Sequence, residues 1–389
     1  MKKVKIVESK GGTFYIKKRN IPKGCYYCLK GAKAVLFLNG ICQRPDHCQW
    51  YCPISESRKN KEYSFINEIR INSITDLFEE LNICKALGMS ITGGEPLFGD
   101  NLEKTIHYIY EVKQKFGSKF HIHLYSNGLN FNETIANRLS GIGLDEIRFH
   151  PHNNNWNVFS LALKKGMSVG AEVPVIPNKP YLDKLERLIL YLDNIGADFI
   201  NLNELEYCFP NSSSMKEKGF CLEPGSIASV VNSKDNALKL VKKMAPEVSI
   251  KIHFCPIIAK DYYQLRNRYI RRANSIRKPY EKITDEGLLI YTQVNGDKSR
   301  LLDFIEFIKS NLVINPRSIL LDGNVVKLPL DVILEDKFLC GLEHFHLECH
   351  IVEILPFRKL EYFQITESTP LKTFIDELNE ESKENSTKI

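Results

Sequence analysis

Three cysteines lie within eleven residues in the segment GICQRPDHCQWYCPIS, at positions 40–55. They are Cys42, Cys48 and Cys52, and an aromatic residue, Tyr51, directly precedes the last of them. Thiolates are soft ligands that suit iron–sulfur clusters and zinc. Because a closed site usually has four ligands, three thiols on one loop favour a cluster with one iron left open for a substrate or cofactor. The alternative is a zinc site completed by His47 or by a distant residue.

A second motif, ITGGEP at residues 91–96, supplies two glycines and a carboxylate. Gly93 and Gly94 let a ligand approach the backbone closely, and Glu95 offers a negative charge to a cation. The motif ends the apolar run that follows the cysteine-bearing unit, so both motifs should lie on the same rim of a sheet. Alone, GGEP is a weak signal because a simple turn has the same composition. Next to the cysteine loop it is a strong one.

Short apolar runs alternate with amphipathic helical segments through the first half of the chain. The six runs lie at residues 33–42, 89–96, 120–128, 145–151, 168–177 and 199–207. This alternation predicts successive βα units and an α/β fold with a parallel sheet, either an open doubly wound sheet or a partial barrel. Glycine and polar residues collect at the carboxyl ends of the runs, where parallel α/β folds bind ligands.

The βα alternation stops after residue 208, and the remainder of the chain has a different pattern. We expect a division into an N-terminal hairpin with a CxxC pair, the βα sheet, a basic helical segment, a small α+β domain and a disordered polar tail, at residues 1–32, 33–255, 256–282, 283–375 and 376–389. We expect the small domain to shape access of a substrate to the sheet.

These motifs resemble those of the radical S-adenosylmethionine enzymes. In that family three cysteines, with an aromatic residue before the third, end the first strand of a six-fold βα partial TIM barrel, and GGE ends the second strand. The resemblance covers roughly residues 33–207. More narrowly, GCYYCLKGAKAVLFLNGIC and QLRNRYIRRANSIRKPYE look like a group of uncharacterised archaeal proteins related to pyruvate formate-lyase activating enzyme. The cysteine spacing, five residues then three, departs from the usual three then two and predicts a longer loop.

The resemblance implies an enzyme, an oxidoreductase or a transferase, that works by radical chemistry. The three thiolates would bind a [4Fe-4S] cluster, and the amino and carboxylate groups of S-adenosylmethionine would chelate the fourth iron. An electron delivered by a reductase, a ferredoxin or a flavodoxin would then break the C5′–S bond. The products would be methionine and a 5′-deoxyadenosyl radical, which takes a hydrogen atom from the substrate.

The resemblance also assigns residues to the cofactor. The backbone of Gly93 and Gly94, with the carboxylate of Glu95, would receive the methionine ammonium group, and Tyr51 would lie near the adenine. Ser126 and Asn127, at the end of the third strand, are candidates for contacts with the ribose or carboxylate, and Arg148 and Glu172, on the fourth and fifth strands, are weaker candidates. For these four, the alternative is a polar barrel residue whose hydrogen bonds are satisfied within the protein.

A CxxC pair, Cys25 and Cys28, precedes the first apolar run with a spacing typical of zinc knuckles and rubredoxin-like sites. Two thiols do not complete a site. We therefore expect an auxiliary cluster or a structural zinc that also uses Cys255, with Cys208 or Cys221 as a fourth ligand. The alternative is a hairpin with two ordinary thiols, since CxxC pairs arise often by chance.

The overall composition is that of a globular protein, with 43% hydrophobic and 26% charged residues. No stretch reaches the ~18 uninterrupted apolar residues that a membrane-spanning helix requires. The basic start MKKVKIVESK has no apolar run behind it, so we expect no secretory signal and a cytoplasmic protein. In a reducing compartment, clustered thiols bind metal or do redox chemistry more often than they form disulfides. The oligomeric state is left open.

A basic segment at residues 260–282 carries eight lysines and arginines against two acidic residues, with four interleaved tyrosines. Such a segment can bind phosphates and stack on unpaired bases. Several radical S-adenosylmethionine enzymes modify tRNA or rRNA, so we favour RNA as the substrate. The alternatives are a protein or peptide target, including activation of a glycyl radical enzyme, and a non-enzymatic iron–sulfur protein that binds RNA. The segment itself could instead be a solvated helix whose arginines pair with acidic groups elsewhere.

Overall fold

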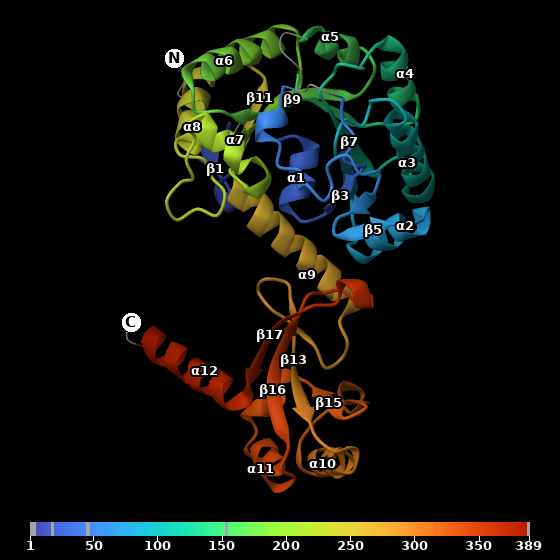
Figure 1. Cartoon of the computed structure of the whole chain (residues 1–389), viewed down its shortest axis with the longest axis vertical. Coiled ribbons are helices and arrows are strands. Elements are labelled where there is room, and N and C mark those ends of the chain that lie inside the picture. The colour runs from blue at the N-terminus through green and yellow to red at the C-terminus, as the bar shows by residue number, and fades with distance from the viewer. Residues whose placement is uncertain (1–4, 17–18, 44–46, 152–154, 387–389) are drawn as a thin grey trace. The chain divides into compact units, whose positions relative to one another are not determined.

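The chain forms two compact units, Met1–Arg268 and Tyr269–Ile389 (Figure 1). The structure is a computed structural model that describes residues 5–16, 19–43, 47–151 and 155–386. The division falls within the basic segment, whereas the sequence placed boundaries on either side of it, after residues 255 and 282. None of the helices in the described ranges combines the length and apolar composition that crossing a bilayer requires.

A large, mostly parallel sheet forms the first unit, as predicted. The parallel strands follow one another in chain order and are β3 (Lys33–Phe37), β6 (Gly88–Thr92), β7 (His121–Ser126), β8 (Glu146–Phe149), β9 (Ser168–Val175), β10 (Phe199–Glu204) and β11 (Lys251–Cys255). Two antiparallel pairs extend the ends, β4 (Ser64–Ile66) with β5 (Ile69–Ile71) and β1 (Ile6–Glu8) with β2 (Phe14–Ile16). The strand order is an open path, so the sheet is a partial TIM barrel.

Helices connect the parallel strands and lie around the outside of the sheet (Figure 1). They are α2 (Ile74–Ile83), α3 (Asn101–Phe116), α4 (Glu133–Gly141), α5 (Asn157–Leu163), α6 (Lys179–Asn194) and α8 (Ser233–Met244). Alternate residues of a strand point to opposite faces, and one set in each strand is apolar and fully buried, for example Leu36, Ile122 and Ile147. The other set is largely polar and faces the barrel interior, where the site is built.

The N-terminal CxxC pair lies on a helix and not on a hairpin. The hairpin is formed by β1 and β2, and it is followed by helix α1 (Lys23–Leu29), which carries Cys25 and Cys28. Helix α1 contacts β3, β6 and β7. The prediction that residues 1–32 form a hairpin carrying this pair was therefore wrong about where the thiols lie.

An antiparallel sheet and flanking helices form the second unit, in agreement with the predicted α+β domain. The sheet contains β12 (Lys282–Ile283), β13 (Leu289–Asn295), β14 (Leu320–Asp322), β15 (Val325–Leu328), β16 (Glu348–Ile354) and β17 (Ile365–Pro370). Its core includes Phe304 of α10 (Lys298–Asn311) and Phe338 of α11 (Asp336–His344). The prediction of a disordered tail at residues 376–389 was wrong for most of that segment, because helix α12 (Leu371–Ser386) extends through it.

The two motif segments are joined by backbone hydrogen bonds that require glycine. The amide of Gly94 donates to the carbonyl of Asn39 at 2.7 Å, and the amide of Glu95 donates to the carbonyl of Ile41 at 2.9 Å. A Cβ atom on Gly94 would lie 2.0 Å from the Ile41 oxygen, and one on Gly93, whose φ is +135°, would lie 2.5 Å from the Asn39 oxygen. The close approach of the cysteine loop therefore requires glycine at both positions, whether or not a ligand is bound.

Replacement of Gly94 by alanine should destabilise the protein by about 2–3 kcal/mol, because the methyl group overpacks against the Ile41 backbone. Urea denaturation measures the free energy of unfolding. Gly141→Ala is the matched control, since nothing lies within 4 Å of its Cβ position, and it should leave stability almost unchanged. Equal stability of the two variants would contradict the close approach.

Candidate active site

The three loop cysteines and the GGE motif line one cavity of about 380 Å³. Cys42 follows the segment that pairs with the glycines, and a single 3-10 turn, η2 (Gln49–Tyr51), connects Cys48 to Cys52. The cavity is lined by the loop cysteines together with Gly93, Gly94, Glu95, Ser126 and Asn127. The structure thus brings together two motifs that lie forty residues apart in the sequence.

Glu95 is buried at the wall of this cavity, and the end of β7 holds its carboxylate. The Ser126 hydroxyl donates to one carboxylate oxygen of Glu95 at 2.8 Å, and the backbone N–H of Asn127 donates to the other at 2.7 Å. The Leu97 amide also donates to the carboxylate, at 3.0 Å. Ser126 and Asn127 were predicted to contact the cofactor. That contact stays a prediction, and in the structure they orient the carboxylate that the resemblance assigns to the methionine ammonium group.

Two buried asparagines that the sequence analysis missed hold the start of the cysteine loop. The side chain of Asn39 donates to the Asn101 side chain at 2.6 Å and accepts from the Ile41 amide at 3.0 Å. Asn101 in turn donates to the carbonyl of Glu95 at 2.9 Å. The sequence signal that could have identified Asn39 is an asparagine directly after an apolar run, as in LFLNG. These bonds fix the loop relative to the GGE segment.

The far end of the loop is held by Tyr51 and Asn211. The hydroxyl of Tyr51 lies 2.6 Å from Nε2 of His150, and Nδ1 of His150 lies 3.1 Å from the carbonyl of Glu172. The side chain of Asn211 donates to the carbonyl of Tyr51 at 3.1 Å. His47, the candidate for a loop zinc site, stacks on His150 with ring centroids 4.8 Å apart and is not among the residues that line the cysteine cavity.

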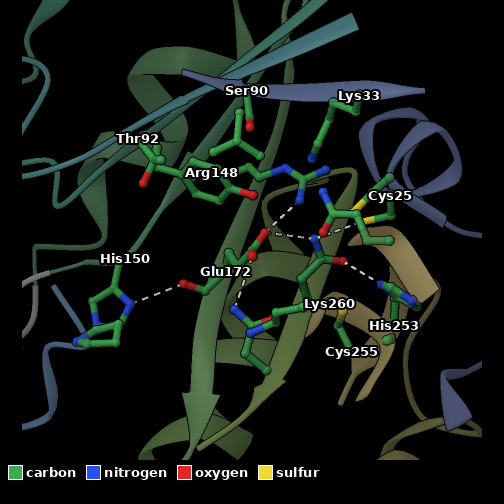
Figure 2. Close-up of a pocket in the computed structure, with 18 of the residues that line it drawn as sticks. Cys25, Lys33, Ser90, Thr92, Arg148, His150, Glu172, His253, Cys255 and Lys260 are labelled. Atoms are coloured by element: carbon green, nitrogen blue, oxygen red, sulfur yellow. Dashed lines mark hydrogen bonds and ion pairs between the residues drawn. The ribbon is translucent and has the colours of Figure 1, made fainter. Parts of the chain in front are cut away.

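A second cavity, of about 420 Å³, adjoins the first and lies inside the barrel (Figure 2). Residues shared by the two linings include Cys48, Cys52, Gly93, Tyr125 and His150. The rest of its lining is rich in charged, amide and thiol groups, among them Cys25, Cys28, Lys33, Arg148, Glu172, Asn201, Asn203, His253, Cys255 and Lys260. A substrate bound in this cavity would therefore lie next to the cysteine loop.

Arg148 and Glu172 are paired with each other in the second cavity. The guanidinium of Arg148 contacts Glu172 at 2.6 Å and Glu146 at 2.5 Å, and Glu172 also accepts from the amides of Asn201 and Asn203, each at 3.0 Å. Burial by itself would raise the pKa of each carboxyl. Arg148, together with His121 beside Glu146 and with Asn201 and Asn203 beside Glu172, outweighs burial and lowers the pKa of both carboxyls to about 2. These contacts agree with the alternative interpretation, in which the two side chains pair within the barrel, and a contact of either with the cofactor stays a prediction.

The three thiols predicted for an auxiliary site all line the second cavity. Cys25 is buried and accepts a hydrogen bond from the Asn201 amide at 3.1 Å. Burial raises the pKa of Cys25 to about 11. Neither Cys208 nor Cys221, the predicted fourth ligands, is among the lining residues. Across the described parts of the chain, no three His, Cys, Asp or Glu side chains are arranged to hold a metal ion as they stand.

Two arginines of the basic segment are buried in internal contacts. Arg268 forms an ion pair with Glu68. Arg272, in the second unit, donates to the carbonyl of Pro356 at 2.6 Å and lies over the ring of Phe357. These contacts agree with the alternative interpretation of the segment, in which arginines pair within the protein.

Comparisons with known proteins agree with the motifs. The family model of the 4Fe-4S single cluster domain matches residues 30–143. A protein of Methanocaldococcus jannaschii, named as a candidate glycyl-radical enzyme activating enzyme, is 35% identical in an alignment of 329 positions that covers 81% of this chain and 84% of that protein.

Solved structures give weaker matches. Streptococcus suis SuiB bound to S-adenosylmethionine is 10% identical with a TM-score of 0.39, over 58% of this chain and 50% of that one. Coproporphyrinogen III oxidase of Escherichia coli, a radical SAM enzyme, is 7% identical with a TM-score of 0.36, over 84% and 94% of the two chains. Both scores are low, so the assignment of a family rests on the sequence relative.

The buried carboxylates predict a specific acid sensitivity. The native pKa values of Glu146 and Glu172 are about 2, against about 4.3 in an unfolded chain. Their contribution to stability is therefore complete above about pH 4.5 and is lost as the pH falls toward 2. Arg148→Met should abolish this loss of stability at low pH and lower the free energy of unfolding at pH 7 by about 3–5 kcal/mol, because both carboxylates lose the arginine that is their main cationic partner.

Urea denaturation at a series of pH values tests this expectation. The raised carboxyl pKa values in the Arg148→Met variant should make it more stable as the pH falls from 7 to 4.5. Arg138→Met is the matched control, since Arg138 forms its ion pair with Glu103 at the surface, and it should keep the wild-type pH profile. A parallel profile for the two variants would refute the role given to Arg148.

Proposed function

The chain belongs to the radical S-adenosylmethionine family, and from this premise we propose that it abstracts a hydrogen atom from a protein substrate. The [4Fe-4S] cluster of the family supplies the electron that cleaves S-adenosylmethionine to methionine and a 5′-deoxyadenosyl radical. Cys42, Cys48 and Cys52 would hold the cluster. The observation that carries the proposal is the shared lining of these thiols, Gly93, Gly94 and Glu95 around one cavity.

The residues of this cavity fit the two groups that they would hold. Three thiols are the soft ligands that iron–sulfur clusters use. The carboxylate of Glu95, held by Ser126 and the Asn127 amide, is placed to pair with an ammonium group. The hydrogen bonds of Asn39 and Asn101 keep the start of the loop against this carboxylate. Tyr51 lines the adjoining barrel cavity and would contact the adenine.

The adjoining barrel cavity is the proposed place of the reacting group of the substrate. It shares Cys48, Cys52 and Gly93 with the cysteine cavity, so a group bound there would lie beside the residues that would hold the cluster and S-adenosylmethionine. The net reaction consumes one electron and one S-adenosylmethionine, and the hydrogen atom passes to 5′-deoxyadenosine. We therefore propose an oxidoreductase with a ferredoxin or flavodoxin as electron donor.

A glycine residue of a partner protein is the proposed source of the hydrogen atom. Support comes from the Methanocaldococcus jannaschii relative, whose name gives it as a candidate activating enzyme of glycyl-radical enzymes. RNA, the substrate favoured by the sequence, has lost part of its support, because Arg268 and Arg272 of the basic segment are buried in internal contacts. A protein substrate is accordingly placed ahead of RNA.

Cleavage of S-adenosylmethionine tests the catalytic part of the proposal. The anaerobically reconstituted protein, reduced with dithionite, should form 5′-deoxyadenosine, and Cys48→Ala should lose both the cluster absorption and the product. Cys340→Ala is the control, because Cys340 is exposed in the second unit, and it should retain both. An intact cluster spectrum without any 5′-deoxyadenosine would exclude the activity.

The origin of the abstracted hydrogen tests the substrate class. Host cells are grown with α-deuterated glycine, and their extract is separated into a nuclease-treated protein fraction and a protein-free RNA fraction. The protein fraction should place deuterium in 5′-deoxyadenosine and produce a glycyl radical signal in electron paramagnetic resonance. Label transfer or product stimulation by the RNA fraction alone would overturn the protein assignment.

A further inference from the structure

A second group of thiol and imidazole side chains lies inside the barrel, on elements other than the cysteine loop. Cys25 and Cys28 come from helix α1, and His253 and Cys255 come from β11, more than 220 residues later in the chain. All four line the barrel cavity of about 420 Å³. Figure 2 shows Cys25, His253 and Cys255 toward one side of this cavity in that view, with His150 toward the other.

The local structure turns these side chains toward the cavity. His253 and Cys255 are two residues apart on β11, so they point to the same face of the strand. Helix α1 lies close to the barrel interior because Gly24 has no side chain. A Cβ atom there would be 2.4 Å from Nδ1 of His123 and 2.6 Å from Nη2 of Arg148. This close approach buries the neighbouring thiol of Cys25.

His253 has an unpartnered ring nitrogen that points to a missing ligand. The side chain is 1% exposed, and its Nε2 atom makes no hydrogen bond. A buried polar atom without a hydrogen-bond partner destabilises a protein. The other ring nitrogen, Nδ1, lies 3.2 Å from Oδ1 of Asn201. Histidine ligands of metals commonly have this arrangement, in which one nitrogen donates to an oxygen and the other binds the metal.

Asn201 also connects the histidine to the thiols. Its side-chain nitrogen donates to Cys25 at 3.1 Å while its oxygen faces His253. One amide therefore lies between ligands from α1 and from β11. The ammonium group of Lys260 lines the same cavity and can offset the net negative charge that three thiolates leave on a divalent metal.

We propose that Cys25, Cys28, Cys255 and His253 bind a second metal centre, either a zinc ion or an iron–sulfur cluster. Three thiols and an imidazole form a ligand set that both accept. Among the described residues, neither this group nor the three loop cysteines has its side chains close enough together to hold a metal ion as they stand. At both sites, metal binding would therefore require side-chain rotation. Asn201 is a positioning residue for this site.

Metal content in a variant that lacks the loop cysteines tests the proposal. Protein with Cys42, Cys48 and Cys52 changed to alanine is loaded anaerobically with Zn²⁺, or with Fe²⁺ and sulfide, and is desalted. About one zinc per chain, or iron together with sulfide, should remain. Adding Cys25→Ala and Cys255→Ala should remove it, whereas adding Cys340→Ala should not.

Variants of His253 distinguish a role as metal ligand from a purely structural role. In the same background, His253→Ala should weaken metal binding, His253→Cys should restore it with four thiols, and Asn201→Ala should lower the affinity about 10–100-fold. Titration with Co²⁺ of the protein with only the loop cysteines replaced gives a further readout, because thiolate coordination produces charge-transfer absorption. These measurements do not depend on cleavage of S-adenosylmethionine, so failure here leaves the proposed reaction intact.

Two results would overturn the second site. One is the absence of retained metal and of cobalt–thiolate absorption in the folded variant that lacks the loop cysteines, as judged by circular dichroism. The other is metal that persists after Cys25, Cys28 and Cys255 are all replaced.

Discussion

A guanidinium buried between two carboxylates is the interaction on which the barrel interior depends. Arg148 contacts Glu146 and Glu172, and all three side chains lie inside the sheet of the first unit. Each charge would be costly to bury alone, but together they compensate one another. Glu172 then orients Asn201 and Asn203, and Asn201 reaches Cys25 and His253. The ion pairs thereby arrange the polar lining of the cavity beside the cysteine loop.

The order of elements and the meeting of the two motifs followed from the sequence. Apolar runs separated by amphipathic segments predict parallel strands, and the carboxyl ends of parallel strands meet on one rim. The cysteine loop after β3 and GGE after β6 therefore had to be neighbours. The sequence alone did not show why the glycines are required, because the close approach of Gly94 to Ile41 depends on how two loops pack.

Other features depend on burial and pairing that composition does not report. The strands HIHLYS and EIRF alternate polar and apolar residues, which was the available signal for a charged interior. For Arg148 and Glu172 the sequence left two interpretations open, because their pairing across two strands depends on the fold. Arg268 and Arg272 counted as surface charge for the same reason. The helix at the C-terminus was missed because its polar composition also suits a disordered segment.

Anchors at both ends of the cysteine loop have a consequence for how this segment can vary. Asn39 and Asn101 fix its beginning, and Asn211 with His150 fixes Tyr51 near its end. Because both ends are held by barrel residues, we expect a change in the number of residues between them to leave the flanking positions in place. The unusual cysteine spacing is thus a change that the rest of the barrel can accommodate without rearrangement, and loop length and barrel architecture can evolve independently.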